Sequence, residues 1–424
     1  MTGGRSLFGP AFVYTLTNAL AAGIPFLLLP VLTRALTPEQ YGQVAMFGVV
    51  VTALGALTGL NVHGSVGVRY FDRESLDYPR YVGACVLILA CSTAVVALLA
   101  WSASSWLQEL TKLPTPWLLA AVLVSGAQIL VQTQLSIWQA VGQPWRYGAV
   151  RVAQSATDAA LSLVLVLMFA FGWQGRVSGM AVAIGFAAVV ALVLMRRGGW
   201  MRFPVRREDV VSALHFGVPL IPHVIGGMLI AMIDRVMISN VLDVASTGIY
   251  MVALQIGMVL GLAADSFNRA YAPWLFETLT QRDARKEASI VRFTYGYFVV
   301  VIAIAVLLGV TAPVVLGFLV GEQFRSAAPI VIYITLGYAF SGMYYMVTNY
   351  VFLARHTARL ALVTITCGSL NVGLSYYLLN RNGVIGAAQA FMTAQFLLFA
   401  ATWWLASRSR PMPWRAALFA LRQA

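Results

Sequence analysis

Charged residues are scarce in this 424-residue sequence, at 10%, while hydrophobic residues make up 60%. A soluble domain carries about 25% charged residues, so a soluble chain of this composition could not cover its surface with polar groups. A lipid bilayer removes that need, because apolar side chains can face lipid directly. The composition therefore argues against a soluble protein and predicts an all-α polytopic membrane protein.

Cysteine and histidine are also rare, with three and four residues. The cysteines, Cys85, Cys91 and Cys367, all lie in apolar segments, and an odd number in such segments indicates neither a disulfide framework nor a metal site. The sequence shows no G-x-S-x-G motif, no phosphate-binding loop and no paired carboxylates of the kind that catalyse hydrolysis. We therefore expect no enzyme, no cofactor and no metal centre.

Long apolar runs recur along the whole chain. A helix needs about 20 apolar residues to cross the bilayer, and the sequence offers twelve such segments. We expect spans at residues 8–32, 43–62, 81–101, 117–141, 150–171, 177–195, 211–236, 248–267, 293–312, 330–354, 360–379 and 384–406.

The positive charges are distributed unevenly between the two sides of these spans. Of the 28 lysines and arginines, only six lie on or near the side opposite the N-terminus: Arg34, Lys112, Arg176, Arg235, Arg325 and Arg381. Cytoplasmic loops carry such an excess, so we expect both termini in the cytoplasm. The net charge of +13 then indicates attraction to anionic lipid, not to nucleic acid.

An internal repeat divides the chain into two halves. Leu36 and Gly42 match Leu242 and Gly248, and Gly179 matches Gly386 at nearly the same separation; a weaker match aligns Asp158 with Asn371. Six spans per half give a parallel repeat, as in transporters with two lobes. We predict lobes at residues 1–200 and 205–406, followed by a basic amphipathic tail at 407–424 on the inner leaflet.

Three acidic residues fall inside predicted spans. Because a charge at bilayer depth is costly, each should face a partner or a wet cavity. Asp265 and Arg269 share a helix face and can pair, whereas Asp234 and the adjacent Arg235 should each meet another helix. With Asp158, these acids either belong to a polar cavity that binds a charged headgroup or passes a proton, or form structural ion pairs that hold helices together.

Other polar residues near the spans are candidates for substrate binding. His63, Arg69 and Arg269 could form a cationic mouth, although ordinary positive-inside charge explains them equally well. Arg34 could face a cavity or reach the lipid interface. Amide side chains at this depth need hydrogen-bond partners, either on neighbouring helices or on a sugar-like ligand. The amides concerned are Asn18, Gln128 and Gln132.

Four motifs stand out along the chain: LLLPVLTRALTPEQYG at 27–42, DRVMIS at 234–239, TGIY at 247–250 and GVIGAA at 383–388. They resemble motifs of the bacterial polysaccharide transporters, the O-antigen and exopolysaccharide flippases of the inner membrane, which belong to the multidrug/oligosaccharidyl-lipid/polysaccharide exporter superfamily. The resemblance implies a flippase that moves a polyprenyl-diphosphate-linked oligosaccharide from the cytoplasmic to the periplasmic leaflet by alternating access. It also implies partners among membrane lipids and other membrane proteins of glycan assembly.

Two other functions stay open. A drug or metabolite antiporter of the same superfamily would use the intramembrane acids as its main binding site. A membrane-embedded glycan polymerase or ligase would present a large periplasmic loop or a reactive His or Asp at a loop edge, and the sequence shows neither. On the flippase interpretation, Arg235 and Arg269 contact the diphosphate or a charged sugar, and Asp234 and Asp265 position them or relay a proton.

Overall fold

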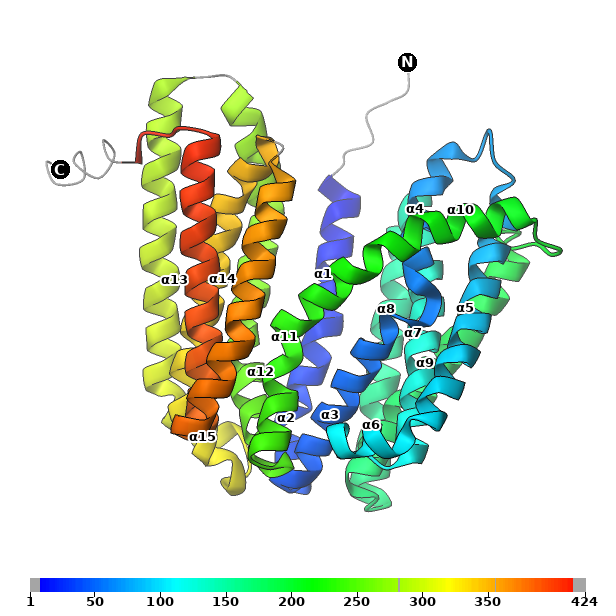
Figure 1. The fold of residues 1–424 in the computed structure, drawn as a ribbon, viewed down its shortest axis with the longest axis horizontal. Helices are drawn as coiled ribbons and strands as arrows, with labels where there is room; N and C mark the ends of the chain where they lie inside the picture. The colour runs from blue at the N-terminus through cyan, green and yellow to red at the C-terminus, as the bar shows by residue number, and fades with distance from the viewer. Residues whose placement is uncertain (1–7, 281–282, 355, 415–424) are drawn as a thin grey trace, which may run out of the picture. The chain divides into compact units, whose positions relative to one another are not determined.

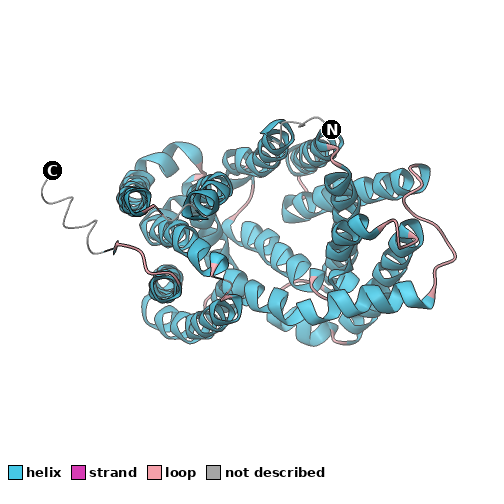
Figure 2. Ribbon diagram, turned by 90° about the horizontal axis from the view of Figure 1, so that it is seen from above, coloured by secondary structure: helices cyan, strands magenta, loops and turns pink. Residues whose placement is uncertain are grey.

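The computed structural model describes residues 8–414, except 281–282 and 355. Within that part of the chain all regular structure is helical (Figure 2), which confirms an all-α protein. Contacts divide the chain into two compact units, Met1–Asn240 and Val241–Ala424. Residues 415–424 of the predicted tail lie outside the described residues.

Among its described residues, from Phe8 onward, the first unit contains eleven α-helices (Figure 1). They are α1 (Phe8–Leu27), α2 (Leu29–Ala35), α3 (Pro38–Gly55), α4 (Val62–Arg69), α5 (Tyr78–Ser102), α6 (Ser104–Thr111), α7 (Thr115–Val141), α8 (Pro144–Leu163), α9 (Gly172–Arg197), α10 (Arg207–Gly217) and α11 (Ile221–Val241). Short 3-10 turns at Thr58–Asn61, Tyr70–Asp72 and Val218–Leu220 and a π-turn at Val164–Met168 connect or extend them.

The hairpin motif at 27–42 owes its shape to local capping. Thr37 accepts a hydrogen bond from the backbone N–H of Gln40 at 3.2 Å, and the Gln40 side chain accepts one from the backbone N–H of Thr37 at 3.3 Å. This reciprocal box satisfies two N–H groups that a helix start otherwise leaves unpaired. Pro38 occupies the first helical turn, where its missing N–H costs nothing.

The second predicted span is bent. The segments Pro38–Gly55 and Thr58–Asp72 meet at 59°, and Gly59 has φ of 74° at the bend. A Cβ atom there would lie 2.8 Å from Ile129 of α7. Glycine is therefore required both for the backbone conformation and for the close approach to α7.

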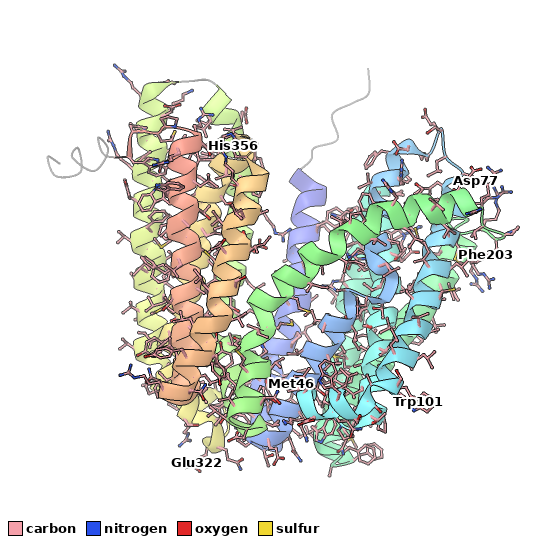
Figure 3. The ribbon with its side chains drawn as sticks, in the orientation of Figure 1. Met46, Asp77, Trp101, Phe203, Glu322 and His356 are labelled. Carbon is pink, nitrogen blue, oxygen red and sulfur yellow. The ribbon has the colours of Figure 1, made fainter. Side chains whose placement is uncertain are left out.

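One hydrophobic core cluster of the first unit lies among α3, α7 and α9, and another of equal size lies among α4, α5 and α7. Met46, Phe47 and Leu118 of the α3, α7 and α9 cluster are fully buried, and Figure 3 labels Met46. Trp173 at the start of α9 packs against Trp117 at 5.0 Å between ring centroids. By contrast, Trp101 is 62% exposed, as an aromatic side chain at a membrane boundary can be.

The second unit contains α12 (Val244–Thr280), α13 (Ala284–Leu319), α14 (Ala328–Leu353) and α15 (Thr357–Ser409), with a 3-10 turn at Glu322–Ala327. Its core includes Tyr271, Phe298 and Tyr350. The long α15 is a helical hairpin, because Gly383 has φ of 59° and ψ of −144° inside it. His356, before its start, lies 2.8 Å from Ser409 at its end, and its two parts run side by side (Figure 1).

These helices are compatible with the predicted twelve spans. Among the described residues, nine helices and one bent pair are long and apolar enough to cross a membrane. The hairpin α15 covers two predicted spans, and α11 overlaps the predicted span at 211–236. The chain is thus a polytopic helical membrane protein.

Equivalent side-chain contacts occur within each of the two aligned halves. Ser162 donates to Asp158 at 3.2 Å, and Ser375 donates to the aligned Asn371 at 3.4 Å. The matched glycines also share a role: a Cβ on Gly179 would lie 2.6 Å from the Ser162 backbone, and one on Gly386 would lie 1.9 Å from the Leu378 carbonyl. Each glycine therefore allows its helix to pack closely on the preceding helix.

Along the chain, the boundary between the compact units falls at the end of α11, between Asn240 and Val241. The predicted boundary between the lobes is near residue 205. Asn240, at the end of α11, donates to the Leu110 carbonyl of α6 at 2.7 Å, and α10 packs on α4 and α5. These contacts join α10 and α11 to the first unit. A lobe is defined as a set of helices that move together during transport, so the predicted boundary between the lobes stays a prediction.

Candidate substrate-binding site

A polar cavity of about 290 Å³ lies between α7 and α8. Gln128 and Gln132, one turn apart on α7, line one wall, and Arg151 and Gln154, one turn apart on α8, line the other; Ile129 and Val131 add apolar surface. The structure thus brings two predicted amides together with a cation from the next helix.

The polar atoms of this cavity have unused hydrogen-bonding capacity. The Nε of Arg151 and the Oε1 of Gln154 are buried and, within the described residues, have no hydrogen-bond partner. The six lining residues include one cation, three amides and no acid. A buried N–H of a cation that lacks a hydrogen-bond partner is costly, so the arrangement favours an anionic ligand that also carries hydroxyl or amide groups.

Two aromatic residues, from α1 and α8, pack in the same hydrophobic cluster as the cavity-lining Val131. Tyr147 of α8 packs edge-on against Tyr14 of α1, with ring centroids 5.0 Å apart, and its hydroxyl donates to Asn18 at 3.1 Å. Both tyrosines belong to the cluster around Val131, which also lines the cavity. The Asn18 amide therefore joins α1 to α8, and Asn18 is not among the cavity-lining residues.

Asp158, two turns beyond Arg151 on α8, belongs to an ion pair between helices. Its oxygens accept from Arg176 of α9 at 2.5 and 3.3 Å, and Arg176 also donates to Ser162 at 2.8 Å. The side chains of Arg176 and Asp158 are only 11% and 15% exposed. The structure therefore shows Asp158 in a partly buried ion pair.

Asp234 and Arg235 pair with each other on α11. A guanidinium nitrogen of Arg235 lies 3.4 Å from Asp234 and another contact joins it to the Ala231 carbonyl. Both residues are buried. The contact of each of these residues with another helix, which the sequence predicts, stays a prediction.

Asp265 and Arg269 pair across one turn of α12, at 2.8 Å, as their spacing predicted. The Arg269 side chain is 68% exposed. Next to it, Asn349 of α14 donates to Asn268 at 2.9 Å and ties the two helices together. The pair thus belongs to the second unit, and its role in substrate binding stays a prediction.

The remaining candidates lie near the ends of helices in the first unit. Arg69 donates to Asp72 at 3.1 Å and to Ser212 of α10 at 3.2 Å. His63 has a buried Nδ1 without a hydrogen bond to any described residue. Arg34 is exposed and donates to the Pro30 carbonyl one turn earlier, at 2.8 Å, just as the aligned Asn240 donates to the Val236 carbonyl at 2.9 Å.

Sequence reasoning missed Arg151 and Gln154. Arg151 counts among the positive charges at the cytoplasmic edge of a span. The spacing of polar residues along α8 is a signal that points to both. Arg151, Gln154 and Asp158 are spaced i, i+3 and i+7 and so share one helical face. In the described part of the chain, no three His, Cys, Asp or Glu side chains converge as a metal site.

Residues 10–279 match the model of the family described as "Polysaccharide biosynthesis protein". The chain belongs to this polysaccharide biosynthesis family. Two relatives come from Haemophilus influenzae. A protein of its Lsg locus is 23% identical over 82% of this chain and 84% of its own length. An uncharacterized membrane protein is 24% identical over 87% of this chain and 89% of its own length.

Two solved structures show that this member of the polysaccharide biosynthesis family has the fold of known transporters. The lipid II flippase MurJ in an inward closed conformation matches with a TM-score of 0.74 at 13% identity, over 94% of this chain and 87% of that one. An inward-facing multidrug resistance MATE transporter of the MOP superfamily matches with a TM-score of 0.69 at 15% identity, over 97% and 96% of the two chains.

Proposed function

We propose that this protein moves a polyprenyl-diphosphate-linked oligosaccharide, an O-antigen or exopolysaccharide repeat unit, from the cytoplasmic to the periplasmic leaflet of the inner membrane. It makes and breaks no covalent bond. The observation that carries the proposal is the cavity in which Arg151 faces three glutamines and no acid. Family membership and the flippase-like fold support it.

The barrier to such a movement is the polar headgroup, because the polyprenyl chain dissolves in lipid. A guanidinium presents N–H groups in a fork that matches phosphate oxygens, and it compensates their charge inside the low-dielectric bilayer. Amides both donate and accept hydrogen bonds and can replace water around sugar hydroxyls. The cavity between α7 and α8 therefore lowers the cost of moving the headgroup, and alternating access carries it across.

A cation antiporter of the same fold would need an accessible acid in its binding cavity. The cavity at Arg151 has none among its lining residues. Asp158, Asp234 and Asp265 each lie within 4 Å of an arginine, so their charges are already compensated. The electrostatics therefore favour an anionic substrate over a cationic one.

The decisive experiment replaces Arg151 in cells from which the chromosomal gene is deleted. Arg151→Gln should stop surface glycan and leave lipid-linked repeat units on the cytoplasmic leaflet, with a normal amount of protein in the membrane. Arg146→Gln is the matched control, because Arg146 lies on the same helix but is exposed and bonds only to Gln143 in the described structure, at 3.1 Å. It should support normal glycan.

Other outcomes would assign a different function. Repeat units that reach the periplasm but stay unpolymerised after gene deletion would indicate a polymerase or ligase. Unchanged glycan together with retention of small cations would indicate an antiporter. Arg235→Ala and Arg269→Ala should reproduce the flipping block if those arginines also contact the diphosphate or a charged sugar.

A further inference from the structure

A second basic site lies between α4 and α10, and it shares no residue with the Arg151 cavity. It is a groove of about 790 Å³. Arg69 lines it from α4, and Arg207, His215 and Ser212 line it from α10, together with Glu208, Val211 and Phe216. The groove thus combines two arginines and a histidine with apolar walls and one acid.

The sequence of α10 explains why these residues face outward. Asp209, Ala213 and Gly217 are buried and recur every four residues, so they form the face that packs on α4, α5 and the turn before α4. A Cβ on Gly217 would lie 2.1 Å from the Leu60 carbonyl, which requires glycine at this contact. Arg207, Val211 and His215 recur with the same spacing on another face and are exposed.

Hydrogen bonds hold the Arg69 side of the groove in place. The Arg69 guanidinium donates to Asp72 and to the Ser212 hydroxyl oxygen. That hydroxyl accepts from Arg69, so its own hydrogen stays available for an acceptor in the groove. Arg69, Ser212, Arg207 and His215 together present a set of donors suited to phosphate oxygens.

The apolar surface around the groove indicates a lipid and not a soluble anion. Val211 is 55% exposed, and α10 continues through a short turn with exposed Val218 and Leu220 into the apolar α11. Charged residues of both signs, Arg206, Arg207, Glu208 and Asp209, stand at the start of α10, and the segment that follows the helix is apolar. Charged and apolar side chains on one exposed helix are typical of the boundary between lipid headgroups and acyl chains. Beside it, Arg202 donates to Asp77 at the start of α5, at 2.7 Å; Figure 3 labels Asp77 and Phe203 at this end of the unit.

We propose that this groove binds an anionic membrane phospholipid, with the lipid phosphate at Arg69, Arg207 and His215 and an acyl chain along Val211 and Phe216. The site is separate from the proposed transport cavity and does not depend on the transported substrate. Its occupant is a resident lipid that holds α10 against α4.

The test measures lipid retention by the full-length protein purified in detergent. Native mass spectrometry should show phosphatidylglycerol bound about tenfold or more in excess of phosphatidylcholine with the same acyl chains, because each basic group near an anionic headgroup contributes roughly fivefold. The double variant R207Q/H215Q should lose this preference. Arg206→Gln is the matched control, because Arg206 is exposed next to the groove but does not line it.

A second variant, Val211→Gln, tests the acyl-chain wall and should weaken retention of phosphatidylglycerol without removing a charge. Equal binding of both lipids, or undiminished phosphatidylglycerol binding in R207Q/H215Q, would overturn the proposal. So would full displacement by soluble glycerophosphate, which would show an anion site without lipid selectivity. Binding of a polyprenyl diphosphate but not of phosphatidylglycerol would instead assign the groove to the transported substrate.

Discussion

The carboxylate of Asp158 on α8 accepts two N–H groups from the Arg176 guanidinium on α9, at 2.5 and 3.3 Å. In the other half, Asn371 occupies the aligned position and keeps the equivalent bond from Ser375, while Gly383 stands where Arg176 would align. The same helix packing therefore forms around an amide in one half and an ion pair in the other.

Removing one member of this pair should destabilise the protein. Arg176→Gln leaves the partly buried Asp158 carboxylate without its cation, at a cost of about 3 to 5 kcal/mol. The double variant D158N/R176Q should recover most of this loss, because it recreates the uncharged arrangement of the second half. Thermal unfolding in detergent measures both; a double variant no more stable than Arg176→Gln would contradict the argument.

The turn at Gly386 should not tolerate a side chain. A Cβ atom there would lie 1.9 Å from the Leu378 carbonyl, so Gly386→Ala forces the α15 hairpin apart and should cost about 1 to 3 kcal/mol. Gly373→Ala, in the same helix but with open space around its Cβ, should be neutral or gain up to about 1 kcal/mol in helix propensity. Comparable melting temperatures for the two variants would refute the packing account.

The Arg151 cavity should contain water. In a background without the three native cysteines, Gln128→Cys and Gln132→Cys should react with a water-soluble thiol reagent, because both positions line the cavity. Leu123→Cys, on the same helix and 63% exposed on an apolar surface, should face lipid and react slowly. If all three positions react at the same rate, α7 does not border a separate wet cavity.

Replacing Arg269 should distinguish an effect on transport from an effect on stability. Its pair with Asp265 is exposed and spans one helical turn, a geometry that contributes only about 0.3 to 0.5 kcal/mol. Arg269→Ala should therefore leave thermal stability almost unchanged. If Arg269 contacts the substrate headgroup, the same variant should accumulate lipid-linked repeat units on the cytoplasmic leaflet; normal surface glycan would remove Arg269 from the site.

Much of this protein followed from its sequence alone. Apolar segment length and charge scarcity predicted the membrane-spanning helices, and the i, i+4 spacing of Asp265 and Arg269 predicted their ion pair. The aligned glycines indicated an internal repeat, and Gly179 and Gly386 both stand where a side chain would collide with a neighbouring backbone, which only glycine avoids. Each of these features depends on residues that are near in sequence or on the solvent that surrounds the chain.

Tertiary structure decided which helix faces meet. Spacing along α8 places Arg151 and Gln154 on one face, but only packing against α7 brings them to Gln128 and Gln132. In the same way, Arg69 and Ser212 are 143 residues apart and become neighbours because Gly217 lets α10 approach the turn before α4. Helical periodicity specifies the face on which a side chain lies, whereas the close packing between helices selects the partner of that face.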